Sequence, residues 1–462
     1  MADFVEFQNK FKGDLITPEH PDYLQAIDRW AHNAARRAKI VAFVKDNEDV
    51  VLALKYAKAA GLRIAICGGG HSASGASSSE DGLVIDLSRY INGATIDAEK
   101  KLAFIGGGAL WKTVDNEAIK YGLASVGGTV NHTGVGGLIL GGGYGWLSGE
   151  HGLVIDNLVQ ATVVVADGRV LTASATENED LFFGIRGGGS NFGVVTEFVL
   201  RLHPQRRTVF AGPIIFTPDK IPQLQPVLDS WWGNVKGNEG MVLGMTRGPD
   251  GQPGILAVLF YNGSAEEGRK NFKAFYDLGP VADLAAEIPY EELNNMQNYL
   301  ATPQKNYYMT GAQLSVKPSQ DLTVEHFNRI IELSGDGSQF LTAVLLELWP
   351  HNKINTIPAD ATPYRRDLTG NALVLVRWEG EDPALLEKAK EAVVAMKSLL
   401  TPGQAYGNYN PDSDYAGLPA DAKAPESKVE GLFRQHYPKL QAIKKKYDPE
   451  MIFNKWFAIT PA

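Results

Sequence analysis

The chain has 462 residues, of which 44% are apolar, and its 44 Lys and Arg against 53 Asp and Glu give a formal net charge of −9. This acidic balance argues against nucleic acid as a partner, because only the three lysines at 444–446 form a basic run, and we expect that run to be a solvated helix end. The only cysteine, Cys67, excludes an internal disulfide and a thiolate metal cluster, so we expect no metal site.

No run of about 18 apolar residues occurs, and the first segment, MADFVEFQNKFKGDLITPEH, mixes charges of both signs. We therefore expect an intracellular protein with no membrane partner; a leader ahead of this sequence would instead allow secretion. At roughly 150 residues per domain, the length predicts two or three domains with large packed cores.

The first half of the chain predicts short elements separated by glycine. The predicted elements are helices at 48–60 and 111–121, and strands at 63–67, 83–87, 103–105, 158–166, 169–172 and 194–202. Gly61 is placed to end the first helix, and Asp167–Gly168 to turn a hairpin. The proline of His203–Pro204 marks a predicted domain boundary.

From Phe210 onward glycine becomes less frequent and the elements lengthen. The predicted elements are strands at 255–261, 341–348 and 373–378, and helices at 266–276, 323–333, 384–400 and 428–448. This pattern predicts an α+β domain in which helices cover an antiparallel sheet.

Glycine is concentrated in one part of the chain, because 28 of the 49 glycines lie between Gly61 and Gly193. Three reasons can explain such clusters: turns with positive φ, close packing of elements, and backbone amides that approach a phosphate or a flat ring. The clusters read GGGHSASG, TGVGGLILGGGYG and RGGGSNFGVVTEF. Taken together, they suit a large cofactor with two phosphates that lies along several turns.

Common catalytic and nucleotide motifs are missing. The sequence has no G-x-S-x-G, no H-E-x-x-H and no strict G-x-G-x-x-G. A near-match to a P-loop begins at Gly263, but Arg269 stands where that loop requires lysine. We therefore expect neither a Rossmann site nor a P-loop.

Six segments, in this order, resemble FAD-linked oxidases of the vanillyl-alcohol-oxidase/p-cresol-methylhydroxylase (PCMH) fold, in their berberine-bridge-enzyme-like branch: GGGHS, TGVGGLILGGGYG, LFFGIRGGGSNFGVVTEFVLRLHP, ATPYRRD, AYGNY and YDPEMIFN. The resemblance covers nearly the whole chain. It implies an α+β, two-domain fold, with a PCMH-type FAD-binding domain at 1–208, an α+β substrate domain at 209–405, and a segment at 406–462 that returns to the FAD domain.

The resemblance implies that His71, in GGGHS, is joined through a ring nitrogen to the 8α-methyl group of FAD. The alternative is a histidine that only caps a glycine turn. In this family the bond fixes the flavin and raises its reduction potential. Many relatives add a bond from a cysteine at the position where this chain has Val130, and we expect Cys67 to be a small buried filler. A monocovalent flavin follows, as in the 6-hydroxy-D-nicotine oxidase branch and some fungal oxidases.

The same motifs imply the other flavin contacts. We expect pyrophosphate contacts from Gly68, Gly69, Gly70 and Ser72. Contacts to the ribityl chain and ring are expected from Thr133, Gly136, Gly137, Gly142 and Tyr144, and contacts near the adenine from Gly188, Asn191, Gly193 and Val195. Further ring contacts are expected from Asn408, Tyr409 and Asn454.

Three residues are candidates for catalysis. Tyr406, in AYGNY, is the leading candidate for the base or hydrogen-bond partner, although its ordinary pKa of about 10 requires a cationic neighbour or a flavin dipole. Glu347 and His351 lie on or just past one strand, and they share a face only if the strand continues through Pro350. A packing role for Tyr406 and a solvent-facing Glu347 are the alternatives. Met309 indicates a less polar pocket than that of relatives.

We expect an oxidase that transfers hydride from an alcohol C–H to flavin N5 and is reoxidised by O₂ to give H₂O₂. The expected partners are a small molecule, either a secondary alcohol or a hydroxylated natural product, and O₂, with a monomer or homodimer as the assembly. The alternatives are an amine oxidase of the hydroxynicotine type and a carbohydrate oxidase, which the absent second cysteine makes less favoured. The last alternative function is that of a flavin-binding carrier or of a dehydrogenase that does not use O₂.

Overall fold

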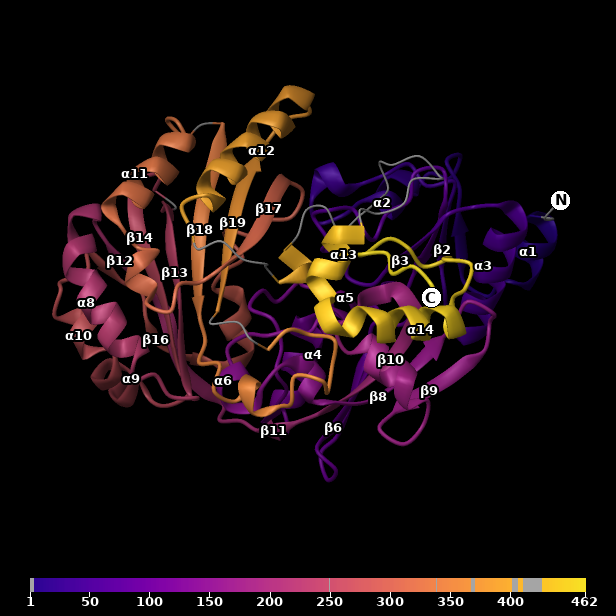
Figure 1. Ribbon diagram of the computed structural model, residues 1–462, viewed down its shortest axis with the longest axis horizontal. Coiled ribbons are helices and arrows are strands. Elements are labelled where there is room, and N and C mark those ends of the chain that lie inside the picture. Colours follow the sequence, from indigo (N-terminus) through magenta and orange to yellow (C-terminus); the bar gives the residue numbers. More distant parts are fainter. Residues whose placement is uncertain (1–3, 249, 338, 367–369, 401–405, 410–425) are drawn as a thin grey trace.

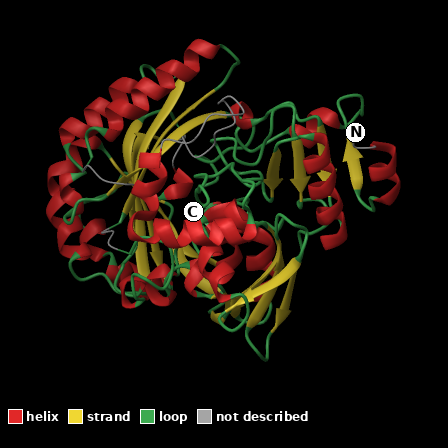
Figure 2. Ribbon diagram, turned by 45° about the vertical axis from the view of Figure 1, so that its right-hand side comes forward, coloured by secondary structure: helices red, strands yellow, loops and turns green. Residues whose placement is uncertain are grey.

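The computed structural model describes residues 4–248, 250–337, 339–366, 370–400, 406–409 and 426–462. Figure 1 shows two groups of elements side by side: a large sheet with its helices, and a group of shorter strands that also holds the C-terminal helices. Figure 2 shows loops, rather than regular elements, between the two sets of strands. Mixed α and β structure in two sets of layers agrees with the α+β prediction.

The N-terminal segment forms a four-stranded sheet in the order β1-β2-β4-β3, in which β2, β4 and β3 are parallel. Its strands are β1 (Asp14–Ile16), β2 (Ile40–Phe43), β3 (Ile64–Cys67) and β4 (Leu83–Asp86). Its helices are α1 (Phe4–Lys10), α2 (Tyr23–Ile27) and α3 (Asn47–Ala60). The Asp46 side chain caps the start of α3, and Gly61, at φ 65°, ends the helix as the sequence predicts.

A second sheet follows, antiparallel and five-stranded, in the order β5-β6-β10-β8-β9. Its strands are β5 (Ala94–Asp97), β6 (Leu102–Gly106), β8 (Leu158–Val164), β9 (Val170–Ser174) and β10 (Val194–Arg201). The neighbouring helices are α4 (Trp111–Ile119), α5 (Val135–Leu140), α6 (Ser148–His151) and α7 (Glu179–Ile185). The chain leaves this group through β11 (His203–Pro204), which pairs with β7 (Leu123–Ala124).

The third sheet has eight antiparallel strands, ordered β15-β12-β14-β13-β18-β19-β17 with β16 paired to β12. The strands are β12 (Thr208–Phe216), β13 (Glu239–Arg247), β14 (Pro253–Tyr261), β15 (Ala282–Asp283), β16 (Ala286–Pro289), β17 (Asn306–Gln313), β18 (Phe340–Leu348) and β19 (Asn371–Trp378). The helices on its outer face are α8 (Ile221–Trp232), α9 (Ala265–Asn271), α10 (Lys273–Tyr276), α11 (Val324–Leu333) and α12 (Pro383–Lys397). The helix predicted at 266–276 is thus divided at Phe272.

Side chains alternate between two cores along this sheet. We call the first two sheets and their helices, residues 4–204, the glycine-rich group. On β18, Val344 and Leu346 pack with the helices on the outer face of the large sheet, whereas Ala343 and Leu345 join the core of the glycine-rich group. The inner face of the large sheet is therefore a wall shared by both groups of elements, and a site can form against it.

The C-terminal helices α13 (Glu426–Phe433) and α14 (Tyr437–Tyr447) lie against the glycine-rich group (Figure 1). Lys444 on α14 is fully buried, and its Nζ donates to Asp448 Oδ2 at 2.6 Å, to the Asn191 carbonyl at 2.7 Å and to the Phe453 carbonyl at 2.6 Å. These three acceptors use all three ammonium protons. The expectation that this lysine is solvated is therefore wrong, although Lys445 and Lys446 are exposed.

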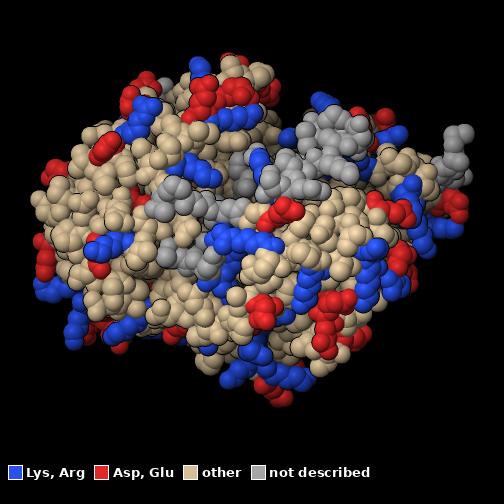
Figure 3. All heavy atoms as spheres, viewed as in Figure 1, with Lys and Arg blue, Asp and Glu red and all other residues tan. Residues whose placement is uncertain are grey.

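On the face shown in Figure 3, basic and acidic side chains are interspersed, with no extended basic field. Within the described ranges, no helix combines the length and the apolar content that crossing a bilayer requires. No three His, Cys, Asp or Glu side chains of the described part lie together as metal ligands. Cys67 is buried, and burial raises the pKa of its thiol, as expected of a filler.

Candidate functional site

A cavity of about 270 Å³ lies between the glycine-rich group and the inner face of the large sheet. The glycine-rich side supplies the turn after β3, helix α5 and the turn before β10. The sheet supplies residues from β17, β18 and β19, and the C-terminal tail supplies Trp456. Segments that are far apart in the sequence therefore line the same cavity, which is typical of a binding site for a large ligand.

Most residues that the sequence singles out line this cavity. The lining cofactor candidates are Gly68, Gly69, Gly70, His71, Ser72, Thr133, Gly136, Gly137, Tyr144, Gly193, Val195, Asn408 and Tyr409. Glu347 and Tyr406 line it as well. The candidates that are not among the lining residues are Gly142, Gly188, Asn191, Asn454 and His351.

Three of these outliers have packing roles. A Cβ on Gly142 would lie 2.3 Å from the Tyr364 ring, and a Cβ on Gly188 would lie 2.4 Å from the Gly184 carbonyl oxygen. Asn191 donates to the carbonyls of Gly188 and Trp456, both at 2.9 Å, and accepts from the amide of Ile459 at 3.0 Å. Asn191 therefore fastens the tail to the glycine turn, and it is not among the residues that line the cavity.

His351 is not brought to the site because β18 ends at Leu348. Its Nδ1 lies 2.8 Å from the carbonyl oxygen of Trp349, and burial lowers its pKa to about 4. The Trp349 ring packs edge-on against Trp146, with 4.8 Å between ring centroids. The strand does not continue through Pro350, so the condition for a shared face with Glu347 is not met.

Two kinds of glycine can be told apart by what a side chain would meet. A Cβ on Gly69 would lie 2.5 Å from the Cα of Gly134, and one on Gly136 would lie 2.8 Å from the Gly107 carbonyl oxygen, so these serve close packing. Gly137 also lines the cavity, yet no atom of the described residues lies within 4 Å of a Cβ placed there. Open space above this backbone, on a helix of the second cluster, fits a flat ring such as that of a flavin.

One end of the cavity is built around two histidines. The Nε2 atom of His71 lies 3.2 Å from the Nδ1 atom of His132. The His71 ring stacks on Trp30 at 4.1 Å between centroids, and Trp30 stacks on Tyr307 at the same distance. Burial, followed by the neighbouring His132, lowers the pKa of His71 to about 3. His71 is therefore neutral near pH 7 and carries a lone pair on one ring nitrogen.

The other end holds a buried carboxyl group. Tyr144 donates its hydroxyl to Glu347 Oε2 at 2.5 Å, and Tyr409 donates to Oε1 at 2.8 Å. Burial raises the pKa of Glu347 to about 7, although these two hydrogen bonds oppose the rise. Glu347 is thus not the solvent-facing strand residue of the alternative interpretation, and it can exist in either protonation state near neutral pH.

The Tyr406 hydroxyl accepts hydrogen bonds from the Gly143 amide at 3.2 Å and from Asn408 Nδ2 at 2.8 Å. Burial raises its pKa well above the ordinary value, and no cation faces its oxygen in these contacts. This environment favours the neutral phenol.

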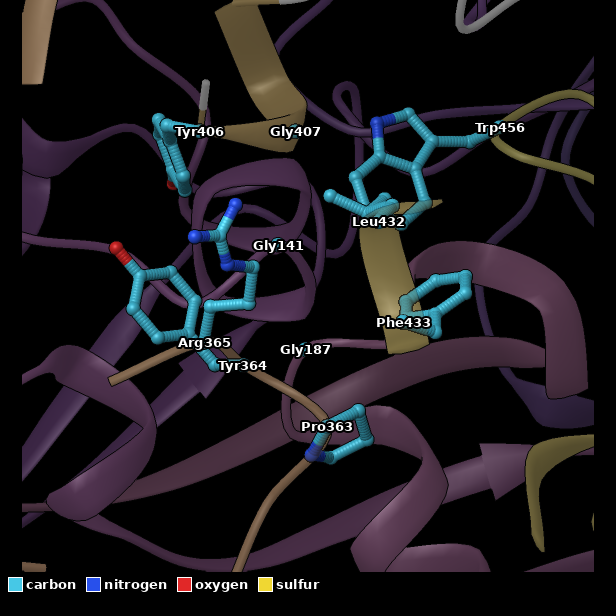
Figure 4. Close-up of a pocket in the computed structure, with 10 residues that line it drawn as sticks. All are labelled: Gly141, Gly187, Pro363, Tyr364, Arg365, Tyr406, Gly407, Leu432, Phe433 and Trp456. Carbon is cyan, nitrogen blue, oxygen red and sulfur yellow. The ribbon is translucent and has the colours of Figure 1, made fainter. Parts of the chain in front are cut away.

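Behind Tyr406 lies a smaller pocket of about 20 Å³ (Figure 4). Figure 4 shows Tyr364 and Arg365 beside Tyr406, with Trp456 and Phe433 across the pocket. Tyr406 and Trp456 line both this pocket and the main cavity, so they separate the two spaces.

Sequence reasoning missed several lining or supporting residues, chiefly Trp30, His132, Gln297 and Trp456. Trp456 lies two residues after Asn454, so the tail reaches the site with a different side chain. His132 stands one residue before the second glycine cluster, and a second histidine there was the available signal.

Residues 38–174 match the FAD binding domain family. The chain is 33% identical over 480 residues to the FAD-linked oxidoreductase pgmH of Aspergillus terreus, covering 100% of this chain and 96% of that protein.

Two solved structures have the same fold. The 6-hydroxy-D-nicotine oxidase of Arthrobacter nicotinovorans superposes with a TM-score of 0.87 at 25% identity, over 98% of this chain and 99% of that one. The glucooligosaccharide oxidase of Acremonium strictum, whose FAD is described as 6-S-cysteinyl, 8α-N1-histidyl, superposes at 0.83 with 21% identity over 100% of both chains.

Proposed function

This chain belongs to the FAD-linked oxidoreductases, and from that premise we propose that it is an oxidase that carries FAD on His71 and removes a hydride from an alcohol carbon. FAD, when bound, supplies the hydride acceptor. We propose that dioxygen is the final electron acceptor and that hydrogen peroxide is released.

The observation that carries this proposal is the position of Glu347. Oxidation of an alcohol removes a proton from oxygen as well as a hydride from carbon, so the site needs a proton acceptor. Glu347 is the only Asp, Glu, Lys or Arg among the described lining residues, and its pKa of about 7 is close to the optimum for a general base near neutral pH. We assign Glu347 as the base, with Tyr144 and Tyr409 holding its two oxygens.

Tyr406 takes a different role in this proposal. Its oxygen already accepts two hydrogen bonds, while its own O–H can donate one more. We propose that Tyr406 orients the substrate oxygen or the ring and does not take the proton. Asn408, which also donates to the Gly137 carbonyl at 3.2 Å, would keep the tyrosine aligned with the open surface of α5.

The cofactor residues follow from the lining. The proposed tether is His71; Gly68, Gly69, Gly70 and Ser72 would hold the pyrophosphate, and Thr133, Gly136, Gly137 and Tyr144 would contact the ribityl chain and the ring. Gly193 and Val195 remain candidates for the adenine half. Gly142, Gly188, Asn191, Asn454 and His351 are not included, because none of them is among the residues that line the cavity.

The substrate wall favours a compact, mainly apolar alcohol. The large sheet contributes the apolar side chains of Met309, Leu345, Leu373 and Leu375 to the cavity, and Tyr307 and Glu347 are its side chains with a polar group there. Such a wall supports a hydroxylated natural product over a sugar chain, which would need rows of hydrogen-bonding groups.

An amine donor is the second candidate. The chain is similar over nearly its full length to a 6-hydroxy-D-nicotine oxidase, and a buried carboxylate can also hold an amine near the flavin. Peroxide formation with amines but not with alcohols would select this alternative.

We propose that the FAD domain comprises 1–208 and 406–462, with the substrate domain at 209–405. The return of α14 to α7 supports the discontinuous arrangement. The second boundary falls beside residues 401–405, which lie outside the described part of the chain.

The direct test is flavin fluorescence on a denaturing gel, with intact mass, for the wild type and His71→Ala. We expect one FAD per chain on the wild-type band alone. Peroxide release with a panel of alcohols and amines then identifies the donor, and stopped-flow reoxidation by O₂ identifies the acceptor. A wild-type protein that stays colourless with added FAD would contradict the proposal.

A further inference from the structure

His71 does not stand alone in the cavity, because its Nε2 atom faces a second histidine at 3.2 Å. We propose that His132 is a positioning residue that prepares His71 for covalent attachment, by accepting the Nε2 proton so that Nδ1 is the attacking atom. This inference rests on the proposed bond between His71 and FAD. It assigns to His132 a role in making that bond and none in the oxidation of substrate.

The contact requires one donor and one acceptor, because two neutral imidazoles face each other through Nε2 and Nδ1. We assign the proton of neutral His132 to its Nε2 atom, which has no hydrogen-bond partner among the described residues, because Nδ1 is the atom that faces His71. A proton on Nε2 of His132 leaves its Nδ1 as an acceptor. His71 then donates from Nε2 and keeps an unshared pair on Nδ1, as a nucleophile requires.

The charge of the product gives a second reason. If His71 formed a bond at Nδ1 and kept its Nε2 proton, the ring would become a cation. Burial and the adjacent His132 already disfavour that form, since they lower the pKa of His71 to about 3. A base in contact with Nε2 removes the proton as the bond forms and avoids a buried charge.

The chemical balance of the step is complete with dioxygen as the oxidant. One bond forms between Nδ1 of His71 and the 8α-carbon, and one C–H bond at that carbon and one N–H bond at Nε2 break. Two electrons and two protons are transferred overall to O₂, which becomes H₂O₂. His132 takes the Nε2 proton and passes it to solvent.

The surroundings hold both rings in place. Trp30 stacks on His71 with 11° between the ring planes. The loop that carries His132 is fixed by its neighbour Asn131, whose amide nitrogen donates to the Asn294 carbonyl at 2.9 Å and whose side chain bonds to Asn295 and Asn298. Asn131 therefore ties the loop beside His132 to the segment that follows β16, which preorganises the imidazole pair.

The test follows covalent attachment over time in air after FAD is added to purified wild type, His132→Ala and His132→Gln. Gel fluorescence and intact mass give the covalent fraction, and absorbance after gel filtration gives the total bound FAD. His151→Gln is the matched control, since His151 also stacks on a histidine, His203, at 3.7 Å, and neither of these two rings lines the cavity, whereas His71 does.

We expect His132→Ala to bind FAD but to attach it about 100-fold more slowly, in the range of general base catalysis. Added imidazole should accelerate this variant, and His132→Gln should be intermediate because its amide oxygen can accept a hydrogen bond from Nε2–H but cannot take the proton. The control variant, His151→Gln, should attach FAD at the wild-type rate. If His132→Ala loses FAD, His132→Phe, which keeps the ring volume without an acceptor, is measured instead with the same expected slowing.

A flavin-loaded Ala or Phe variant that attaches FAD at the wild-type rate would overturn the role of His132. Noncovalent FAD in the wild type itself would instead overturn the proposed bond to His71. The two failures are therefore distinguishable.

Discussion

The two ends of the cavity each bury a titratable side chain, but the partners differ. Burial lowers the pKa of His71 to about 3 and raises that of Glu347 to about 7, so both groups move toward their neutral forms. At the histidine end the contacts are neutral rings, whereas two tyrosine hydroxyls donate to the carboxylate at the other end.

This difference in partners sets what each end can do. Hydroxyl donors stabilise the charged form of Glu347, so that it can gain and lose a proton near neutral pH. Among the described residues that contact His71 there is no acidic side chain, and the ring stays an uncharged nucleophile. One end therefore suits a permanent bond, and the other suits a proton that is exchanged in every turnover.

Glu347→Gln removes the acceptor and keeps the shape, so it should give the largest effect. We expect substrate oxidation to slow about 10³-fold, within the range for loss of a general base. The measurement is anaerobic flavin reduction with a substrate found by the peroxide panel, with covalent flavin content as the control. A rate within about threefold of the wild type, at equal flavin content, would remove Glu347 from the role of base.

The pH dependence is the next largest expectation. Because the base must be ionised, kcat/KM should rise about tenfold per pH unit below pH 7 and level off above the pKa of about 7. The profile of Glu347→Gln should lack this limb. The free energy of unfolding should change with pH in the opposite direction. A carboxyl group whose pKa is raised on folding stabilises the fold at low pH, and this contribution is lost as the pH rises through about 7.

Tyr409→Phe should have a smaller effect, because Tyr144 remains to hold the carboxylate. Loss of one hydrogen bond worth about 1 kcal/mol should raise the pKa of Glu347 by roughly 0.7 unit. The midpoint of the kcat/KM profile should move to higher pH, while the plateau changes little. An unchanged midpoint would mean that this hydroxyl does not tune the carboxyl group.

His351→Gln should have the smallest effect on turnover. The ring contacts the Trp349 carbonyl and does not line the cavity, so kcat/KM should stay within about twofold of the wild type. The thermal midpoint is the appropriate companion measurement, since any cost should appear there. A large loss of kcat with an unchanged thermal midpoint would show that His351 takes part in catalysis.

Local sequence patterns predicted much of the fold. Gly61 ends α3 as expected, the hairpin of β8 and β9 forms at Asp167–Gly168, and the strands of the second half build one antiparallel sheet. His71 and Glu347, which the sequence singles out, both line the cavity, because each lies at or near the end of a strand whose position the sequence pattern predicts.

Residues whose roles depend on distant neighbours were not predictable. Lys444 looks like a surface lysine, but its acceptors come from a turn and a tail that meet only in the folded chain. Gly142 and Gly188 belong to the predicted clusters, yet Tyr364 and Gly184 fill the space beside them. His71 and His132 are 61 residues apart, so the sequence shows a histidine beside each glycine cluster but does not show that the two rings meet.

The tail that carries Trp456 also determines when the cofactor can be loaded. Asn191 and Lys444 fasten this tail to the glycine turn, and Trp456 completes the cavity lining, yet the tail follows the whole eight-stranded sheet in chain order. During translation the first glycine clusters leave the ribosome long before their closing segment. Flavin insertion should therefore be a post-translational event, and a flavin-bearing molecule is one whose synthesis has passed that tail.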